Sequence, residues 1–283
     1  MQLPKKMLIV GLGLLGGSYA EALSSKGYEM YAIAHRQASI DYAVKKGIIK
    51  AGTIEVDKDF VSQFDLVIFA LYPHILVEWI KKYHTYLKPG AILTDVTGVK
   101  RAIIPSIKEI IKDDPVEFVF AHPMAGREVY GVENATGELF KKANFIVTPT
   151  PDNKEESILL IEQLGWAIGS HHVARLTPEM HDEMIGYVSQ LAHVIAVSLM
   201  TAKDCDLLYE YTGNSFRDLT RIADINEDMW SELFMDNKDK LLEQIDLFMA
   251  EMTKMRNALD KGDVETMKKM MELSSFRRKK FRA

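Results

Sequence analysis

The chain has 283 residues, a length that favours two domains over one. Hydrophobic residues make up 47% and charged residues 27%, and the net charge of −5 with a pI near 5.9 argues against nucleic acid as the main partner. The one cysteine, Cys205, excludes an internal disulfide. We expect no signal peptide and no membrane span, since no apolar run approaches ~20 residues, and we expect a cytoplasmic protein.

The first motif is an apolar run, residues 7–10, followed by the glycine-rich stretch 11–18 and a helical pattern. This strand–turn–helix order is the context that the dinucleotide fingerprint G-x-G-x-x-G requires. Glycines at these positions allow the tight turn, the approach of a pyrophosphate and the packing of helix on strand. The alternative is a structural turn with no cofactor. We predict that a dinucleotide contacts Gly11, Leu12, Gly13, Leu14, Leu15 and Gly16.

A second strand, residues 28–34, ends in Ala34-His35-Arg36. An NAD-preferring fold places an acidic residue at this strand end to bind the ribose hydroxyls, and none is available here. A small residue leaves space, and an arginine clamps a 2′-phosphate through charge-assisted hydrogen bonds. We therefore predict that His35 and Arg36 contact NADP. The alternative is a solvated Arg36 with NAD as the cofactor.

Strands and helices alternate onward to residue 175, the pattern of a doubly wound Rossmann domain over residues 1–175. Ligands of such sheets bind beyond the carboxyl ends of the strands, so we expect the glycine turn, Leu71, Tyr72, Thr97 and His122 to meet in one crevice. The predicted strands are 64–71, 91–96, 117–121, 145–148 and 171–175, and the predicted helices are 38–46, 74–86, 101–112 and 153–165.

The remainder, residues 176–283, has helical patterns alone, at 178–203, 216–224, 227–259 and 263–281. Its methionines and leucines exceed what one thin helical layer can bury, which predicts a homodimer through this domain. The alternative is a monomer whose helices cover the sheet edge. The basic run 277–280 is typical of a helix C-terminus, where cations are favoured.

Four side chains are candidates for chemistry. His122 follows an apolar strand at the crevice edge, where a histidine can take a proton from a substrate hydroxyl. His181 and His193 lie twelve residues apart on one predicted helix, and no metal-ligand spacing accompanies them. Arg221 sits among apolar residues, so we expect an anionic partner, either a protein carboxylate or a substrate carboxylate.

Several motifs together resemble the prephenate dehydrogenase family, which also contains arogenate and cyclohexadienyl dehydrogenases. The histidine motif and the Thr-Arg-Ile-Ala stretch are the more specific of them. The matching stretches are the glycine turn with 16–18, 95–100, 122–126, 181–182, 189–193 and 216–223, followed by Trp230.

The resemblance implies oxidative decarboxylation of prephenate to 4-hydroxyphenylpyruvate, with hydride transfer to NAD(P). It implies that His122 accepts the proton of the 4-hydroxyl, that Arg221 holds a substrate carboxylate and that His193 positions the substrate. His181 and Trp230 are further candidates for substrate contact.

Two positions depart from the family pattern: Gly98 stands where many members carry serine, and Gln190 where histidine is frequent. Thr97 is the candidate to supply the missing hydroxyl to the histidine and the nicotinamide, and a water in its place is the alternative. Three other functions stay open: an arogenate dehydrogenase, a β-hydroxyacid dehydrogenase using Lys203, and a protein that binds NADP without turnover.

Overall fold

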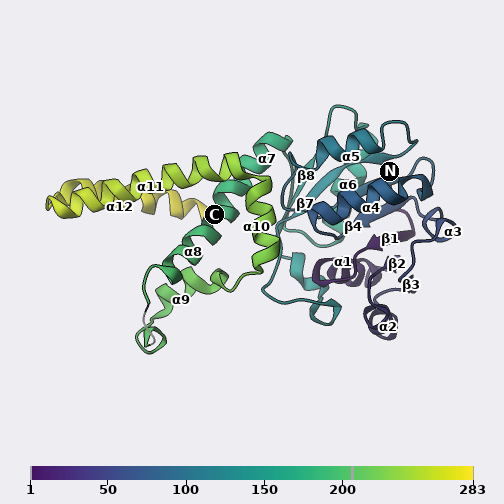
Figure 1. Cartoon of the computed structure of the whole chain (residues 1–283), viewed down its shortest axis with the longest axis horizontal. Helices are drawn as coiled ribbons and strands as arrows, with labels where there is room; N and C mark the ends of the chain where they lie inside the picture. Colours follow the sequence, from purple (N-terminus) through teal and green to yellow (C-terminus); the bar gives the residue numbers. More distant parts are fainter. Residues whose placement is uncertain (1, 205–206, 283) are drawn as a thin grey trace.

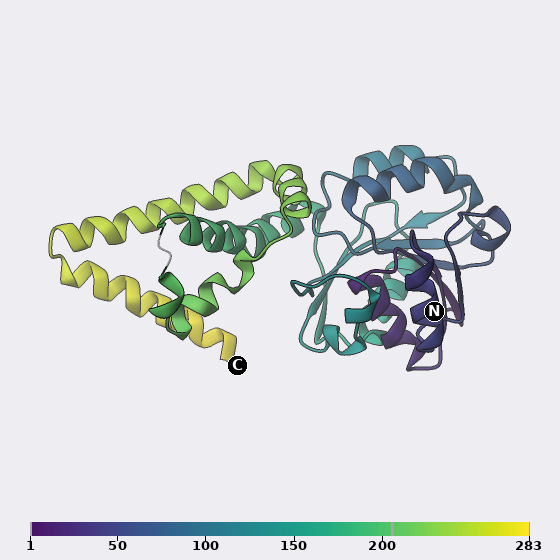
Figure 2. The same ribbon diagram turned by 60° about the horizontal axis from the view of Figure 1, so that its bottom comes forward.

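The computed structural model describes residues 2–204 and 207–282, and Cys205 lies outside them. Two bodies lie side by side, a layered α/β domain and a helical domain with a long projecting hairpin (Figure 1). Helices α7 (Pro178–Ile185) and α10 (Glu227–Asp236) are the helical elements nearest the α/β domain in both views (Figures 1 and 2).

The main sheet is parallel, with strand order β3-β2-β1-β4-β5-β6. Side chains of β1 alternate across it, since Met7 and Ile9 join the core beneath one face while Leu8 and Val10 join the core beneath the other. Burial on both faces explains why these strands are continuous apolar runs. The strands are β1 (Lys6–Val10), β2 (Glu29–Ile33), β3 (Ala51–Thr53), β4 (Leu66–Phe69), β5 (Ile92–Asp95) and β6 (Glu117–Phe118).

Helices cover both faces of this sheet, and two separate hydrophobic cores hold them there. One core takes side chains from α1, α2 and α6, and the other from α4 and α5. The doubly wound Rossmann fold predicted for this part of the chain is confirmed. The helices are α1 (Leu14–Ser24), α2 (Gln37–Lys45), α3 (Lys58–Val61), α4 (Pro73–Tyr83), α5 (Ile104–Ile110) and α6 (Glu155–Ala167).

The strands predicted up to residue 175 do not all join the main sheet. The predicted strand 117–121 divides at Val119, whose N–H makes the last ladder bond to β5, at Leu93. Beyond it the chain turns away into a second, three-stranded sheet. That sheet contains β7 (Phe120–Pro123), antiparallel to β8 (Asn144–Thr148), and β9 (His172–Arg175), which is parallel to β8.

The helical domain opens with one continuous helix rather than several. Thr177 caps it by accepting the N–H of Met180, and a π-helical turn at Gly186–Gln190 joins α7 to α8 (Leu191–Thr201). By length and composition this helix, Pro178–Thr201, qualifies to cross a membrane, which the sequence reading did not expect. Part of it lies against α11, and 28% of its most apolar window is buried.

The predicted helix 227–259 is two helices, because Asn237 interrupts it. Its φ of −123° and ψ of 27° end α10 and start α11, and its buried amide donates to the carbonyl of Asp182 and to Gln190. The remaining helices are α9 (Asn214–Thr220), α11 (Lys238–Asp260) and α12 (Val264–Lys279).

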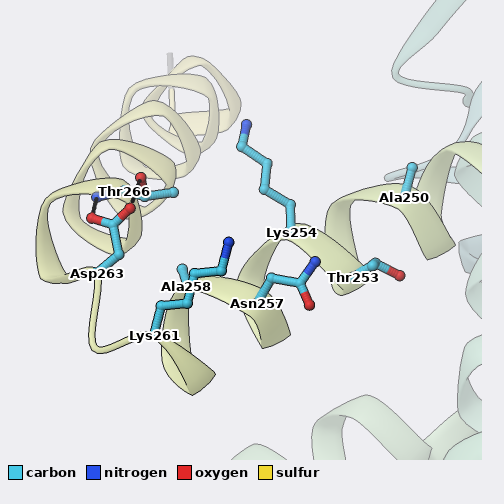
Figure 3. Close-up of a pocket in the computed structure, with 8 residues that line it drawn as sticks. All are labelled: Ala250, Thr253, Lys254, Asn257, Ala258, Lys261, Asp263 and Thr266. Atoms are coloured by element: carbon cyan, nitrogen blue, oxygen red, sulfur yellow. Dashed lines mark hydrogen bonds between the residues drawn. The ribbon is translucent and has the colours of Figure 1, made fainter.

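Helices α11 and α12 form a hairpin that projects away from the α/β domain (Figure 2). Near its turn at Gly262, a shallow hollow is lined by residues of α11, including Lys254, by Lys261 and Asp263 in the turn, and by Thr266 of α12 (Figure 3). Its lining comes wholly from the hairpin, so it is separate from the site at His122.

Polar contacts join the two domains along one seam. His74, at the start of α4, gives its backbone N–H and its ring Nδ1 to Glu232 of α10. Arg101 makes a two-point ion pair with Asp239 of α11, at 2.8 and 3.2 Å. These contacts place α10 over the carboxyl end of the main sheet.

Candidate active site

A buried ion pair anchors the loop that leaves β5. Lys100 is fully buried, and its Nζ donates to Asp95 Oδ2 at 2.5 Å and to the carbonyl of Ala121 at 2.6 Å. Asp95 Oδ1 accepts the N–H of Ala121 at 3.0 Å. Burial lowers the pKa of Lys100, and the carboxylate of Asp95 opposes that shift. The pair therefore ties β5 to β7 one residue before His122.

The structure corrects the prediction that Thr97 supplies a hydroxyl to the crevice. Thr97 Oγ1 donates to Asp95 Oδ2 and lies 3.0 Å from the carbonyl of Val99, and it accepts from Lys100 Nζ at 3.1 Å. A hydroxyl has one donor and two acceptor positions, and here Asp95 takes the donor position and Lys100 one acceptor position. Thr97 supports the ion pair rather than a substrate or cofactor.

Gly98 and His122 face each other across the crevice. A β-carbon on Gly98 would lie 3.9 Å from His122 Nε2 and 3.6 Å from the side chain of Leu233, on α10. Gln190 holds this part of α10, because its side-chain amide donates to the carbonyl of Leu233 at 2.8 Å. The departure at Gln190 thus has a structural use, and Leu233 covers the space beside His122.

A chain of polar side chains leads from His122 into the helical domain. His122 Nδ1 lies 3.0 Å from His181 Nε2, and His181 Nδ1 lies 2.7 Å from Asp182 Oδ1. His181 and Asp182 are fully buried. This corrects the prediction that His181 contacts substrate, because both of its ring nitrogens face protein partners.

The protonation of these histidines follows from burial. Burial lowers the pKa of His122 well below its usual range, and His181 and Lys100 lower it further. Burial also lowers the pKa of His181, while its hydrogen bond to Asp182 opposes the shift. His122 is therefore neutral near pH 7 and able to accept a proton.

His193 and Trp230 form a stacked pair on the helical side. Their ring centroids are 3.6 Å apart at an interplanar angle of 31°, and His193 Nδ1 lies 2.9 Å from the carbonyl of Ser189, one helical turn earlier. Burial lowers the pKa of His193, and the positive charge of Arg221 lowers it further. The ring is thus fixed by its helix and by the indole, with Nε2 left for another group.

Arg221 has a protein carboxylate as its partner. Its guanidinium is 2.8 Å from Glu128, in the loop that follows His122, and its side chain is 65% exposed. The expectation of a semi-buried arginine was wrong, whereas the expectation of an anionic partner is met by Glu128. A cation of the helical domain therefore stands beside the loop that carries His122.

The glycine turn fits a dinucleotide. Gly11 has a φ of +100°, and a β-carbon on it would lie 2.3 Å from the carbonyl oxygen of Ala70, so glycine is required. A β-carbon on Gly16 would lie 1.9 Å from the Gly11 carbonyl, whereas one on Gly13 would meet nothing within 4 Å. The space above Gly13 and the start of α1, which no side chain caps, suit a pyrophosphate.

The other predicted cofactor residues divide by position. Leu12 is buried in the core, so its side chain does not contact a cofactor, while Leu14, Leu15 and Leu71 are partly exposed. Tyr72 is exposed at the start of α4. His35 and Arg36 are exposed just after β2, whose last carbonyl, at Ile33, accepts the N–H of Gly11 at 2.8 Å.

Sequence reasoning missed several residues that build this site. Lys100 was seen as part of a motif without a role, Asp182 was expected to orient a ring or to cap a neighbour, and Glu128 and Leu233 were not considered. The signal for Asp95 and Lys100 is a pair of charges at and just after an apolar strand, since such charges are almost never buried unless paired. Lys203 is exposed beyond the end of α8, away from His193, so it lacks the position a catalytic lysine needs.

The fold and this crevice define the class of protein. A parallel sheet with a fingerprint glycine turn, a neutral histidine and a helical domain closing over both describe a two-domain dehydrogenase that uses a pyridine nucleotide.

The comparisons with known proteins give the family. Residues 19–174 match the model of the prephenate dehydrogenase nucleotide-binding domain, and residues 177–273 match that of the prephenate dehydrogenase dimerization domain. The chain belongs to the prephenate dehydrogenase family.

Known members cover nearly the whole chain. Prephenate dehydrogenase of Lactococcus lactis is 30% identical over 95% of this chain and 75% of its own length, and that of Bacillus subtilis is 27% identical over 94% and 73%. A crystal structure of prephenate dehydrogenase from A. aeolicus in complex with hydroxyphenyl propionate and NAD+ has a TM-score of 0.87 and 29% identity, and the match covers 99% of this chain and 98% of that one.

Proposed function

We propose that this protein oxidises prephenate to 4-hydroxyphenylpyruvate with loss of CO₂. The observation that carries the proposal is the geometry of His122, whose Nδ1 lies 3.0 Å from His181 Nε2 and whose Nε2 lies on the side of Gly98 and Leu233. A nicotinamide cofactor held at the glycine turn would supply the acceptor for the hydride of the hydroxyl-bearing ring carbon.

The residues of this chain account for the proton. The 4-hydroxyl hydrogen passes to His122 Nε2 while the hydride leaves, and it returns to the phenolate oxygen once the ring carboxylate has departed as CO₂. No net proton is released, and the aromatic product supplies the driving force. A base in this role contributes roughly 10²–10⁴-fold to the rate.

Arg221 and the stacked His193–Trp230 pair serve the substrate side. Prephenate carries two carboxylates, and Arg221 is an exposed guanidinium that can exchange Glu128 for one of them. His193 Nε2 and the indole face offer a hydrogen bond and an apolar surface to the ring.

We further propose NADP as the preferred cofactor. Arg36 stands three residues after the end of β2, beside the glycine turn, and no acidic side chain occupies that strand end. The KM values for NAD and NADP in the unmodified protein and in Arg36→Ala test this. We expect a lower KM for NADP and a loss of that preference in the variant. A preference for NAD that the variant leaves unchanged would refute it.

Arogenate is the second candidate substrate, and Glu128 is the observation that favours it. Arogenate carries an ammonium group where prephenate has a keto oxygen, and a carboxylate beside Arg221 suits that cation. Incubation with prephenate or arogenate, each with NAD or NADP, while the absorbance of reduced cofactor is followed, decides between them. If no reduced cofactor forms with either acid, the protein is not a dehydrogenase of this kind, and cofactor binding without turnover remains as its function.

The helical hairpin supports a homodimer. Its apolar residues are widely exposed in the single chain, at Leu242, Leu247, Met249, Met252, Leu259, Met271, Leu273 and Phe276. A patch of this extent favours a second copy as its cover. Sedimentation equilibrium should give twice the chain mass, and Leu247→Glu should shift the population toward monomer. A monomer at all concentrations would refute the dimer.

A further inference from the structure

The side chains behind His122 form a chain with a fixed direction. Asp182 Oδ1 accepts the backbone N–H of Lys100 at 3.0 Å, and Oδ2 accepts that of Arg101 at 2.8 Å. Since all of its other partners are N–H donors, this carboxylate acts as an acceptor toward His181 Nδ1 as well. His181 therefore carries its hydrogen on Nδ1.

The protonation of His181 fixes the donor and the acceptor in its hydrogen bond with His122. A neutral imidazole has one N–H, so His181 Nε2 holds a lone pair and accepts a hydrogen bond. The atom that faces it, 3.0 Å away, is His122 Nδ1, which must carry the hydrogen. His122 Nε2 is then the unprotonated nitrogen, and it is the nitrogen that lies toward Gly98 and the crevice.

We propose that Asp182 and His181 are positioning residues that hold His122 in the tautomer whose Nε2 accepts the substrate proton. This rests on the proposed function, in which His122 is the base. Only one proton moves, from the substrate oxygen to Nε2. The bond from Nδ1–H to His181 stays in place, and the Asp182 carboxylate faces the positive charge that arises on the ring through His181.

The chain also crosses the boundary between the domains. His122 belongs to β7 of the α/β domain, whereas His181 and Asp182 belong to α7 of the helical domain. Asp182 accepts two backbone N–H groups of the loop that follows β5, so the contact that joins the domains also fixes the tautomer of His122. The α/β domain by itself leaves the His122 tautomer undefined.

Asp182→Asn is the sharpest variant. The amide nitrogen must replace one of two oxygens that each accept a backbone N–H. At the Oδ1 position it also faces His181 Nδ1 as a donor, so His181 then donates from Nε2 and His122 carries its hydrogen on the wrong nitrogen. The same exchange behind a catalytic histidine elsewhere costs about 10⁴ in kcat. We expect kcat to fall by at least ~10²-fold, up to the ~10⁴-fold that removal of a base costs, with the KM values for substrate and cofactor nearly unchanged.

His181→Gln and His181→Leu form the rescue pair. A glutamine oxygen can accept the hydrogen of His122 Nδ1, whereas leucine cannot, so the glutamine variant should retain the larger kcat. Asp239→Asn is the matched control, because it weakens the exposed ion pair to Arg101 at the same seam without touching the chain of side chains. Its kcat should equal that of the unmodified protein.

A measurement that needs no substrate keeps the proposal falsifiable if a variant fails to fold. ¹⁵N spectra of the histidine-labelled protein, assigned with His122→Asn, should show Nδ1 protonated and Nε2 unprotonated at pH 7. Protonation at Nε2 of His122 would overturn the proposal, as would a folded His181→Leu with normal kcat. Absence of turnover with prephenate and arogenate, beside the expected spectrum, would refute the proposed function and leave the tautomer assignment standing.

Discussion

Gly98 shows how one absent side chain shapes the crevice. The space beside it is bounded by Leu233 and by His122 Nε2 at ordinary contact distances. The backbone there does not demand glycine, because its φ lies outside the left-handed region that other residues avoid. The site therefore has room for a small polar side chain next to its base.

Gly98→Ser should be tolerated. Its β-carbon meets neighbours at 3.6–3.9 Å, so the free energy of unfolding should change by less than about 0.5 kcal/mol, and activity should persist. Gly98→Val is the matched control, because its extra methyl groups reach Leu233 and should cost about 1–3 kcal/mol by overpacking. Urea denaturation with steady-state assays measures both. A serine variant that folds but is inactive would contradict this prediction and show that activity requires the space beside Gly98 to be unoccupied.

His122 and Arg221 should separate in their kinetics. His122→Asn removes the proton acceptor, so kcat should fall roughly 10²–10⁴-fold with a small change in KM. Arg221→Ala weakens carboxylate binding and should mainly raise the KM for substrate. Steady-state rates over a range of substrate concentrations distinguish the two. The reverse pattern would contradict these roles.

At the scale of elements, the long helix from Pro178 to Thr201 organises the helical half of the site. Its π-helical turn carries Gln190 inward, where it meets Leu233 and Asn237. The start of this helix carries His181, which contacts His122. Its middle carries Gln190, which bonds Leu233 of α10, and His193 follows three residues later. Inserted turns of this kind are frequent at functional sites.

Asn237→Ala should destabilise the protein. The buried amide of Asn237 donates to Asp182 and Gln190 at 2.8 Å each, so its loss leaves a buried acceptor on Gln190 without that donor. We expect the free energy of unfolding to fall by about 1–3 kcal/mol. Asn214→Ala, at an exposed position of α9, should be nearly neutral in the same urea titration. Equal stability of the two variants would contradict the prediction.

Periodic and apolar patterns predicted most helices and strands, but they did not predict which strands pair with one another. The apolar runs around β1, β4 and β5 and the glycine turn located the Rossmann core, because burial on both faces leaves a continuous signal. The three-residue strand β3 (Ala-Gly-Thr) lacks such a run, and the turn-away at Val119 depends on a ladder bond to β5 that no local pattern encodes.

For the candidate site, the sequence likewise predicted which residues matter better than it predicted their contacts. His122, His193 and Arg221 were found because their types and motifs suggest chemistry. The hydroxyl of Thr97 was assigned to the histidine and the cofactor, and the ring of His181 to substrate, because sequence gives no direction for a side chain. Contacts 82 residues apart, such as Asp182 with Lys100, arise only from the docking of two domains.

For the whole molecule, stability should depend on pH through its buried histidines. The folded protein lowers the pKa of His122 and of His181 by burial, so the unfolded chain binds their protons first. Stability is therefore complete above a pH of about 6.5 and falls as the pH drops below it. Urea titrations between pH 7.5 and 5 (roughly one unit or more on each side of that value) should show this decline.

His122→Asn provides the control for that decline. Removal of one of the buried histidines should make the slope of stability against pH shallower in the same window. An unchanged slope, or a stability that rises on acidification, would show that other groups dominate the proton uptake on unfolding.

The order of the two domains along the chain has a consequence for synthesis. A ribosome completes the α/β domain before α7 emerges, and domains generally fold as units in that order. On our proposal, the nascent domain can already hold a dinucleotide at its glycine turn, while His122 still lacks the neighbour that sets its proton. Cofactor bound at that stage stabilises the growing chain by mass action without being consumed. Once His181 and Asp182 have folded against His122, the same bound cofactor can take part in the reaction.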